Sequence, residues 1–453
     1  MFMIITPTLR RGLLLAASCC SLSSALLAGP WESLFNGRDF TGWKPLNGTA
    51  PYAVVDGAIV GTTVAGSPNS FLATEKTYGD FIFECEMMQD VGPSNSGVQF
   101  RGLSTPEYNN GRVHGYQMEI ESSARAWAGG IYDEARKGWF YPVTLNPSAH
   151  SAYQFGRWNR IRIEAIGSSI RTWINGVPVS SVVDDQTAAG FFALQVHSIN
   201  NPADAGRRNH WRNLRVQTTD LQPSPSDGLY VRNLIPNHLS AEEQAQGWRL
   251  LWDGQSTKGW RSAKGGAVPP SWEMKDGVLS VLGTPSGADL ATDEAFGAFE
   301  LQLEFRLTDG ANSGVKYYVT NANGSSLGLE YQLLDDAKHP DAKLGSGGNR
   351  TLGSLYDLIP RGRMPGGLAV IPRIGEWQHA RIVARADKRV EHWLNGIKVV
   401  EFDRSSPLFA SLVGRSKFAK EEAFGQAEQG VILLQDHGDR VDFRSIKVRP
   451  LAR

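Results

Sequence analysis

The sequence predicts an all-β protein made of two tandem β-sandwich domains. Two observations carry this prediction. A series of landmarks in the first half of the chain recurs in the same order in the second half, and within each half short alternating runs of apolar and polar residues are separated by Gly-containing turns. The 453 residues include 49 Gly and 13 Trp, and long helical patterns are scarce. Short strands and tight turns of this kind are typical of sandwiches.

The landmarks show an internal duplication. The tetrapeptide at 95–98 recurs unchanged at 312–315, and the pairs Trp31/Trp43 and Trp248/Trp260 are both 12 positions apart. Further landmarks recur in order: Tyr116-Gln117 as Tyr331-Gln332, Tyr132-Asp133 as Tyr356-Asp357, Trp173-Ile174-Asn175-Gly176 as Trp393-Leu394-Asn395-Gly396, and Gln195-Val196-His197 as Gln435-Asp436-His437. The period is far longer than the roughly 20–45 residues of a solenoid repeat, so each copy is a whole domain.

The duplication divides the chain into parts. We expect a signal peptide over 1–28, a first sandwich over 31–217, a linker with a short helix over 218–246 and a second sandwich over 247–453. Within the linker, Ser240 and Glu243 have the spacing of a capping box, which predicts the helix start. In each sandwich, Asn175-Gly176 and Asn395-Gly396 predict a tight type I′ hairpin turn.

The N-terminus has the pattern of a secretory signal. Arg10-Arg11 precede an apolar stretch of small residues that is short for a membrane span of about 20 residues, although a membrane anchor is the alternative reading. Cys19 and Cys20 follow a poor lipobox, so a lipid anchor is not expected. After cleavage Cys85 alone would remain, without a disulfide partner. The expected location is secreted or periplasmic, with no stable membrane span.

Charge and motifs exclude several functions. The chain has 46 basic and 46 acidic residues, and this balance argues against nucleic acid as a partner. The sequence contains no phosphate-binding loop, no Cys-x-x-Cys, no His-Glu-x-x-His and no nucleophile elbow.

The two Gln-x-His segments predict the floor of a polar site. Each ends an apolar run, and alternation along a strand places Gln195 with His197, and Gln435 with His437, on one face. The same alternation adds polar neighbours from the strands around them: Asn95, Arg101, Gln117 and Glu119 in the first copy, and Asn312, Lys316, Glu330, Gln332 and Asp336 in the second. Polar alternation is also what any solvated sheet face shows.

Other residues are expected near these faces. Gly97 and Gly314 would leave room for a ligand to approach the sheet. Residues after Gly-rich loops would line the rim: Tyr132, Asp133 and Glu134 in the first copy, and Tyr356 and Asp357 in the second. The loop residues Trp127 and Trp139 are candidates for stacking on sugar. A divalent cation is possible, held by Glu330, Asp336 and His437, or by Asp335, Asp336 and His339, because carboxylates and imidazoles are metal ligands. A solvated loop explains Asp335, Asp336 and His339 equally well.

The ordered landmarks resemble the 3-keto-disaccharide hydrolase domain family. The resemblance rests on Leu34-Phe35-Asn36-Gly37, on Asn-Ser-Gly-Val in both halves, on residues 115–120 and 128–134, and on residues 330–336, 392–396 and 434–438. It covers nearly all of the chain after residue 28. It implies a concanavalin A-like jelly-roll sandwich in each copy, and an exported bacterial enzyme that cleaves carbohydrate substrates oxidised at C3.

Chemistry suggests a route for such cleavage. A ketone at C3 acidifies the hydrogen on C2, so a base can form an enolate that expels the anomeric substituent, and water then adds back. The route needs a base, an acid and a group that stabilises the enolate. We assign His437, Lys316 and Glu330 to these catalytic roles in the second copy, and His197 and Glu119 in the first. His437 cannot be both a metal ligand and a free base, and the sequence does not decide between the two.

Asn312, Gln332, Gln435, Asn95, Arg101, Gln117, Gln195, Tyr132, Asp133 and Tyr356 are assigned to substrate binding. Two other functions stay open: a non-catalytic, lectin-like glycan-binding protein, and a direct hydrolase that uses two carboxylates, Glu119 with Glu121 or Glu330 with Asp336. Which copy is active is also open at this point.

Overall fold

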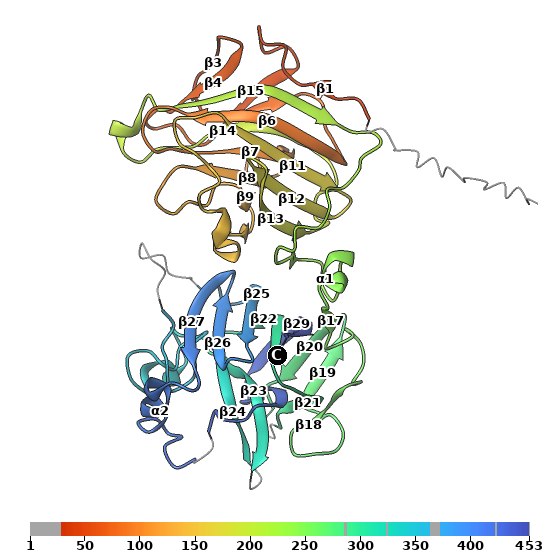
Figure 1. Cartoon of the computed structure of the whole chain (residues 1–453), viewed down its shortest axis with the longest axis vertical. Coiled ribbons are helices and arrows are strands. Elements are labelled where there is room, and N and C mark those ends of the chain that lie inside the picture. The colour runs from red at the N-terminus through yellow and green to blue at the C-terminus, as the bar shows by residue number, and fades with distance from the viewer. Residues whose placement is uncertain (1–28, 285–287, 323–324, 363–371, 422–423, 453) are drawn as a thin grey trace, which may run out of the picture.

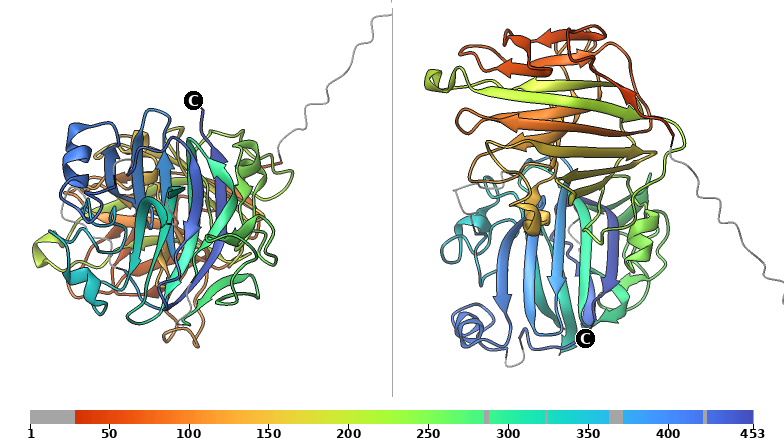
Figure 2. Two further views of the ribbon diagram at one scale, coloured as in Figure 1. Left: turned by 90° about the horizontal axis from the view of Figure 1, so that it is seen from below. Right: turned by 45° about the horizontal axis from the view of Figure 1, so that its top comes forward.

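The computed structural model describes residues 29–284, 288–322, 325–362, 372–421 and 424–452. The predicted signal peptide therefore lies outside the described residues. Two all-β units follow each other along the long axis of the molecule, with the connecting segment between them (Figure 1). The strands of one unit run roughly across those of the other (Figure 2). No helix of the described residues is long and apolar enough to cross a membrane.

The first unit is a sandwich of two sheets, as predicted. One sheet runs, edge to edge, through β16 (Arg232–Asn233), β13 (Val177–Val183), β12 (Ser169–Ile174), β11 (Asn159–Ile166), β6 (Phe81–Gln89), β15 (Arg208–Gln217), β4 (Ala58–Thr62) and β3 (Tyr52–Val55), with β1 (Glu32–Ser33) beside β15. The other contains β10 (Gly138–Tyr141), β9 (Ile131–Glu134), β8 (Gly115–Glu121), β7 (Asn95–Gly102), β14 (Phe191–Val196), β5 (Ser70–Thr74) and β2 (Trp43–Asn47).

The second unit repeats this arrangement. Its larger sheet contains β19 (Trp272–Lys275), β20 (Val278–Leu282), β29 (Arg440–Pro450), β22 (Phe299–Leu307), β25 (Gln378–Ala384), β26 (Arg389–Leu394) and β27 (Ile397–Asp403), with β17 (Arg249–Leu250) beside β29. The smaller contains β18 (Trp260–Ser262), β21 (Leu290–Phe296), β28 (Gly430–Leu434), β23 (Asn312–Ala322) and β24 (Ser325–Leu334). This is the predicted pair of tandem jelly-roll sandwiches.

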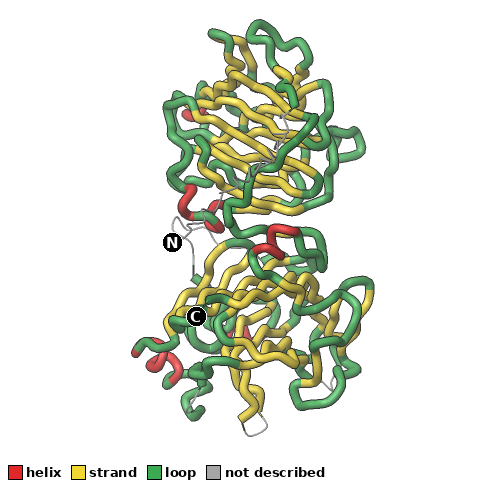
Figure 3. Tube along the Cα trace, turned by 45° about the vertical axis from the view of Figure 1, so that its right-hand side comes forward, coloured by secondary structure: helices red, strands yellow, loops and turns green. Residues whose placement is uncertain are grey.

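Helical turns are few and short (Figure 3). The two α-helices among the described residues are α1 (Ala241–Ala245) and α2 (Pro407–Val413). Four 3-10 turns accompany them: η1 (Val143–Leu145), η2 (Pro147–Ala149), η3 (Pro202–Asp204) and η4 (Pro340–Lys343). The predicted capping box is present at α1, because the Ser240 hydroxyl accepts from the Glu243 N–H while the Glu243 carboxylate accepts from the Ser240 N–H.

Alternation along the strands builds the two cores. In β6 the side chains of Phe81, Phe83, Cys85 and Met87 are buried between the sheets, and the Phe192 ring of β14 lies 4.6 Å from that of Phe81. Burial raises the pKa of the Cys85 thiol, which has no disulfide partner among the described residues. The two predicted Asn-Gly turns have positive φ at both positions, as type I′ turns require.

Candidate functional site

The polar face of the first copy lies on β7, β8 and β14, on the side of the smaller sheet away from the core. Cross-strand pairing places Gly97 opposite Glu119, Gln99 opposite Gln117 and Gln195 opposite Gly97. The face is hollowed into a cavity of about 340 Å³ lined by Asn69, Asn95, Arg112, Gln117, Glu119, Arg125, Tyr132, Glu134, Ala135, Trp139 and His197. The structure thus brings together five predicted site residues, Asn95, Gln117, Glu119, Tyr132 and His197.

Glu119 is the buried acid of this cavity. Its side chain is only 4% exposed, and burial raises the pKa of its carboxyl to about 7. Asn95 Nδ2 donates to Glu119 Oε1 over 2.5 Å, and Arg125 lies 3.6 Å from the same carboxylate. These groups favour the ionised form, but burial outweighs them. A carboxyl group with a pKa near neutrality can act as a general base or acid.

Several buried polar atoms around Glu119 lack a partner among the described residues. They are Asn95 Oδ1, Gln117 Oε1 and Gln195 Nε2. Gln117 Nε2 is used internally, because it donates to Gln195 Oε1 at 3.4 Å and to Glu119 Oε2 at 3.3 Å. Buried polar atoms are normally hydrogen-bonded, so unpaired ones beside a cavity are suited to contact a polar ligand.

His197 follows the end of β14, at the wall of the cavity. Its Nδ1 lies 2.6 Å from the carbonyl oxygen of Ser198. A carbonyl oxygen can only accept, so Nδ1 carries a proton and Nε2 of the neutral ring is the acceptor. His197 can therefore take up a proton at Nε2, as the sequence-based assignment requires.

The second copy has its own buried acid. Glu330 of β24 pairs in register with Lys316 of β23, and its side chain is 6% exposed. Burial raises the pKa of the Glu330 carboxyl, against the opposing influence of the Lys316 and Lys417 ammonium groups. Lys417 Nζ lies 4.1 Å from the centre of the Tyr356 ring, which places Tyr356 beside this group. Gln332 Nε2 donates to Asn312 Oδ1 over 3.0 Å, and Gln435 donates its backbone N–H to the Gly314 carbonyl oxygen.

Strand register reveals that the acid changes place between the copies. In the first copy Gly97 pairs with Glu119, whereas in the second copy the equivalent Gly314 pairs with Gln332. By the same register, the position of Gln117 in the first copy is taken by Glu330 in the second. The sequence match of Tyr116-Gln117 with Tyr331-Gln332 is therefore two residues out of register. A shift of two residues keeps a side chain on the same face of the strand, so Glu119 and Glu330 both lie on the polar side.

Gly97 and Gly314 do not leave room for a ligand, contrary to expectation. A Cβ atom at Gly97 would lie 2.5 Å from Cδ of Gln117, and one at Gly314 would collide with the carboxylate of Glu330. The missing side chain at each glycine lets the neighbouring strand's side chain lie flat across the sheet. These glycines position Gln117 and Glu330 instead.

Arg101 does not lie on the polar face. Arg101 has φ of 44° and β7 changes register against β14 near this point, so alternation fails. Its guanidinium is buried and donates to the carbonyl oxygens of Gly79 and Gly167 and to Asp80. Tyr318, at the same position of the second copy, also has positive φ and joins the core.

Asp133 and Asp336 are also placed elsewhere than predicted. Asp133 is fully buried and accepts from Arg136, on the opposite face of β9 from Tyr132. Asp336 accepts from the Leu352 N–H and forms an ion pair with Arg361 at 3.0 Å. The proposed partner carboxylate Glu121 is bound by Arg125 and by the Trp127 N–H. Glu121 and Asp336 are thus engaged by the protein, which argues against a two-carboxylate mechanism.

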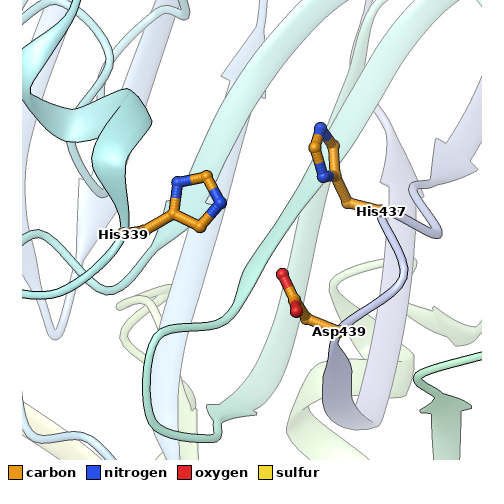
Figure 4. Close-up of side chains that lie close together, drawn as sticks. All are labelled: His339, His437 and Asp439. Carbon is orange, nitrogen blue, oxygen red and sulfur yellow. The ribbon is translucent and has the colours of Figure 1, made fainter.

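His437 belongs to a different group of possible metal ligands than predicted. One ligand atom each of His339, His437 and Asp439 lies within 4.8 Å of the others, and the three side chains converge from two loops (Figure 4). His339 Nδ1 accepts from the Asp341 N–H, so the proton of the neutral ring is on Nε2, and His339 could bind a cation through Nε2 only after the proton moves and this hydrogen bond is given up. Glu330 and Asp336 are not members. Two imidazoles and a carboxylate suit a divalent cation such as Zn²⁺.

Sequence reasoning missed part of the wall of the first cavity. Arg112 Nη2 donates to Glu134 over 2.7 Å, and Asn69 Nδ2 donates to the same Glu134 oxygen over 3.1 Å. Asn69 and Arg112 come from separate segments, and nothing in their local sequence marks them, whereas Glu134 belongs to the run 132–134 that was expected at the rim. Trp127 is only 4% exposed and belongs to the core, whereas Trp139 is half-buried and lines the cavity.

Comparison with known proteins agrees with this arrangement. A family model described as the 3-keto-alpha-glucoside-1,2-lyase-like domain matches residues 30–217 and again residues 247–449. The chain belongs to this family. Both copies of the domain match the family model.

Individual relatives are each similar to part of this chain. A 3-keto-disaccharide hydrolase of Bacteroides thetaiotaomicron is 33% identical over 246 residues, covering 47% of this chain and 81% of the relative. The crystal structure of a candidate glycosyl hydrolase of Parabacteroides distasonis is 28% identical, with a TM-score of 0.42, and the match covers 48% of this chain and all of that one. A carbohydrate binding module of Bacillus subtilis is 16% identical, with a TM-score of 0.25, over 39% of this chain and 95% of that one.

Proposed function

We propose that this protein is a carbohydrate hydrolase that cleaves glycosides of sugars oxidised at C3, by elimination across C1–C2 followed by addition of water. The observation that carries the proposal is Glu119, a buried carboxyl group with a pKa of about 7 in a polar cavity. Family membership and the relative named 3-keto-disaccharide hydrolase support the same substrate class.

The first cavity supplies the groups that elimination needs. Ionised Glu119 removes the proton from C2, which the neighbouring ketone acidifies. Arg125, which lines the cavity and lies 3.6 Å from the Glu119 carboxylate, is a cationic donor available to the enolate oxygen. His197, through Nε2, exchanges a proton with the leaving group and then with the incoming water. In the second copy Glu330, with Lys316 and Lys417 beside it, takes the corresponding role.

The test is release of 4-nitrophenol from 4-nitrophenyl 3-keto-β-glucoside by the purified protein. Glu119→Gln removes the base but keeps the side-chain shape, so we expect a loss of about 10²–10⁴-fold in kcat. Glu330→Gln, assayed alone and together with Glu119→Gln, measures the contribution of the second copy. Full activity of the doubly substituted protein would refute both assignments. Affinity for unoxidised glycans without turnover of the keto-glucoside would favour a glycan-binding protein instead.

We also propose that the protein is exported, on the basis of the signal pattern over residues 1–28. Mass spectrometry of the N-terminus of protein recovered from a bacterial periplasm or culture medium tests this. A mature N-terminus close to residue 29 is the expected result, and retention of Met1 would contradict it.

A further inference from the structure

A second and larger cavity lies where the two copies meet. Its volume is about 660 Å³, within the range of about 300–1,000 Å³ usual for ligand sites. The first copy contributes Arg125, Lys137 and Trp139 to its wall, and the second contributes Arg373, Trp377 and Arg444. The cavity therefore exists only in the tandem protein.

This cavity adjoins the Glu119 cavity. Arg125 and Trp139 line both of them, and Arg125 lies 3.6 Å from the Glu119 carboxylate. Burial raises the pKa of Tyr132 in the first copy, and the charge of Arg373 in the second copy opposes this rise. Arg373 therefore lies near Tyr132. A group that leaves C1 of a sugar held at Glu119 can therefore pass Arg125 and Trp139 into the space between the copies.

The wall of the larger cavity has an excess of positive charge. Its basic members are Arg125, Arg136, Lys137, Arg232, Arg373 and Arg444, and its acidic members are Glu304 and Glu376. Glu304 is shared by Arg232 and Arg444, while Arg125 and Arg136 are paired with Glu121 and Asp133.

Two cations of this wall remain for a ligand. Lys137 forms no ion pair within 4.0 Å over the ranges that the structure describes, although its charge opposes the rise in the pKa of the Asp184 carboxyl that burial causes. Among the described residues Arg373 forms an ion pair with Glu376, at 3.3 Å, and both side chains are more than half exposed, so this pair is weak. A guanidinium and an ammonium group in the wall of one cavity attract a carboxylate.

We propose that the cavity between the copies is the leaving-group subsite of the Glu119 cavity and that it selects a leaving group bearing a carboxylate. The substrate class is then a 3-keto-glycoside of an acidic sugar or of a carboxylated phenol. This inference rests on the proposed function for its meaning, and it assigns the second copy a role in substrate selection by the first.

Binding can be measured without turnover. Isothermal titration compares 4-carboxyphenyl β-glucoside with the neutral 4-carbamoylphenyl β-glucoside, neither of which carries the ketone that elimination needs. The full-length wild-type protein should bind the carboxylate about tenfold more tightly, because hydrogen bonds to charged groups are stronger than neutral ones. The double variant Lys137→Ala, Arg373→Ala should lose this preference. Arg415→Ala, which removes an exposed guanidinium outside the cavity, should retain it.

Equal affinity of the wild-type protein for the two glucosides, absence of binding at millimolar concentration, or a preference that survives in the double variant would each overturn the proposal. The outcome is separate from that of the catalytic proposal. If the protein fails to cleave 3-keto-glucosides but prefers the carboxylated glucoside through Lys137 and Arg373, the subsite stands and the reaction is wrong.

Discussion

At the scale of single residues, the environment of Glu119 determines how stability depends on pH. Its carboxyl pKa rises from 4.5 to about 7 on folding, so the folded state holds the proton more tightly than the unfolded chain does. The stabilisation is complete below pH 4.5 and is lost as the pH rises through 7. The shift corresponds to about 3 kcal/mol.

Urea unfolding between pH 4 and 8 measures this linkage. Wild-type protein should become less stable across the window, whereas Glu119→Gln should show a flatter profile because the amide does not titrate. Glu107→Gln, an exposed glutamate, is the matched control. Profiles of equal slope for wild type and Glu119→Gln would show that the Glu119 pKa is not raised.

The cluster of His339, His437 and Asp439 predicts a bound divalent cation. Substituting a residue that hydrogen-bonds to a metal ligand commonly weakens metal binding about 10–100-fold. His437→Ala removes a ligand itself, so it should weaken Zn²⁺ binding by at least as much. Elemental analysis after dialysis against Zn²⁺ measures the metal content. His150→Ala, at an exposed histidine outside the cluster, should bind like wild type. Equal metal content in the two variants would exclude the site.

At the scale of secondary structure elements, the irregularity at the end of β7 turns Arg101 inward. Its three hydrogen bonds tie β7 to the loops around Gly79 and Gly167. Arg101→Ala removes these three hydrogen bonds together with the buried side chain that donates them, so we expect a loss of about 2–3 kcal/mol in the free energy of unfolding. Chemical denaturation checks it, with exposed Arg38→Ala as the control. Lost activity at unchanged stability would instead show that Arg101 contacts substrate.

At the scale of the whole molecule, the connecting segment 218–246 holds the copies together. In the first copy β16 pairs in parallel with β13, and Arg171 donates to the Ser224 and Pro225 carbonyl oxygens. In the second, the Lys447 ammonium contacts the Glu243 carboxylate of α1 at 2.8 Å, with both side chains buried. The segment predicted as a linker is thus packed on both sandwiches.

Tyr230 of this segment predicts coupled unfolding of the copies. Its ring belongs to the core of the first sandwich, and its hydroxyl donates to Gln302 of the second over 2.5 Å. Tyr230→Ala removes both contacts and should cost about 3–5 kcal/mol, separating one thermal transition into two. Differential scanning calorimetry shows the separation, and Tyr230→Phe, which keeps the ring, should retain a single transition. Unchanged coupling in Tyr230→Ala would assign the coupling to other contacts.

Local sequence was sufficient for the fold. Alternation and Asn-Gly turns predicted the sandwiches because these signals depend on neighbouring residues only, and comparison of the two halves of the sequence predicted that there are two of them. The same alternation placed Asn95, Gln117, Glu119 and His197 on one face. It failed at Arg101, where a single residue with positive φ reverses the facing of the side chain.

The two Gln-x-His segments, which the sequence made equivalent, have different surroundings in the structure. His197 lines the cavity of Glu119, whereas exposed His437 lies beside His339 and Asp439. By itself the sequence determined the duplication, the sandwich class and most of the polar face. Tertiary structure alone decided the exchange of acid and amide between the copies, part of the wall of the first cavity and the basic cavity between the copies. These depend on strand register and on contacts between distant segments, which local patterns do not record.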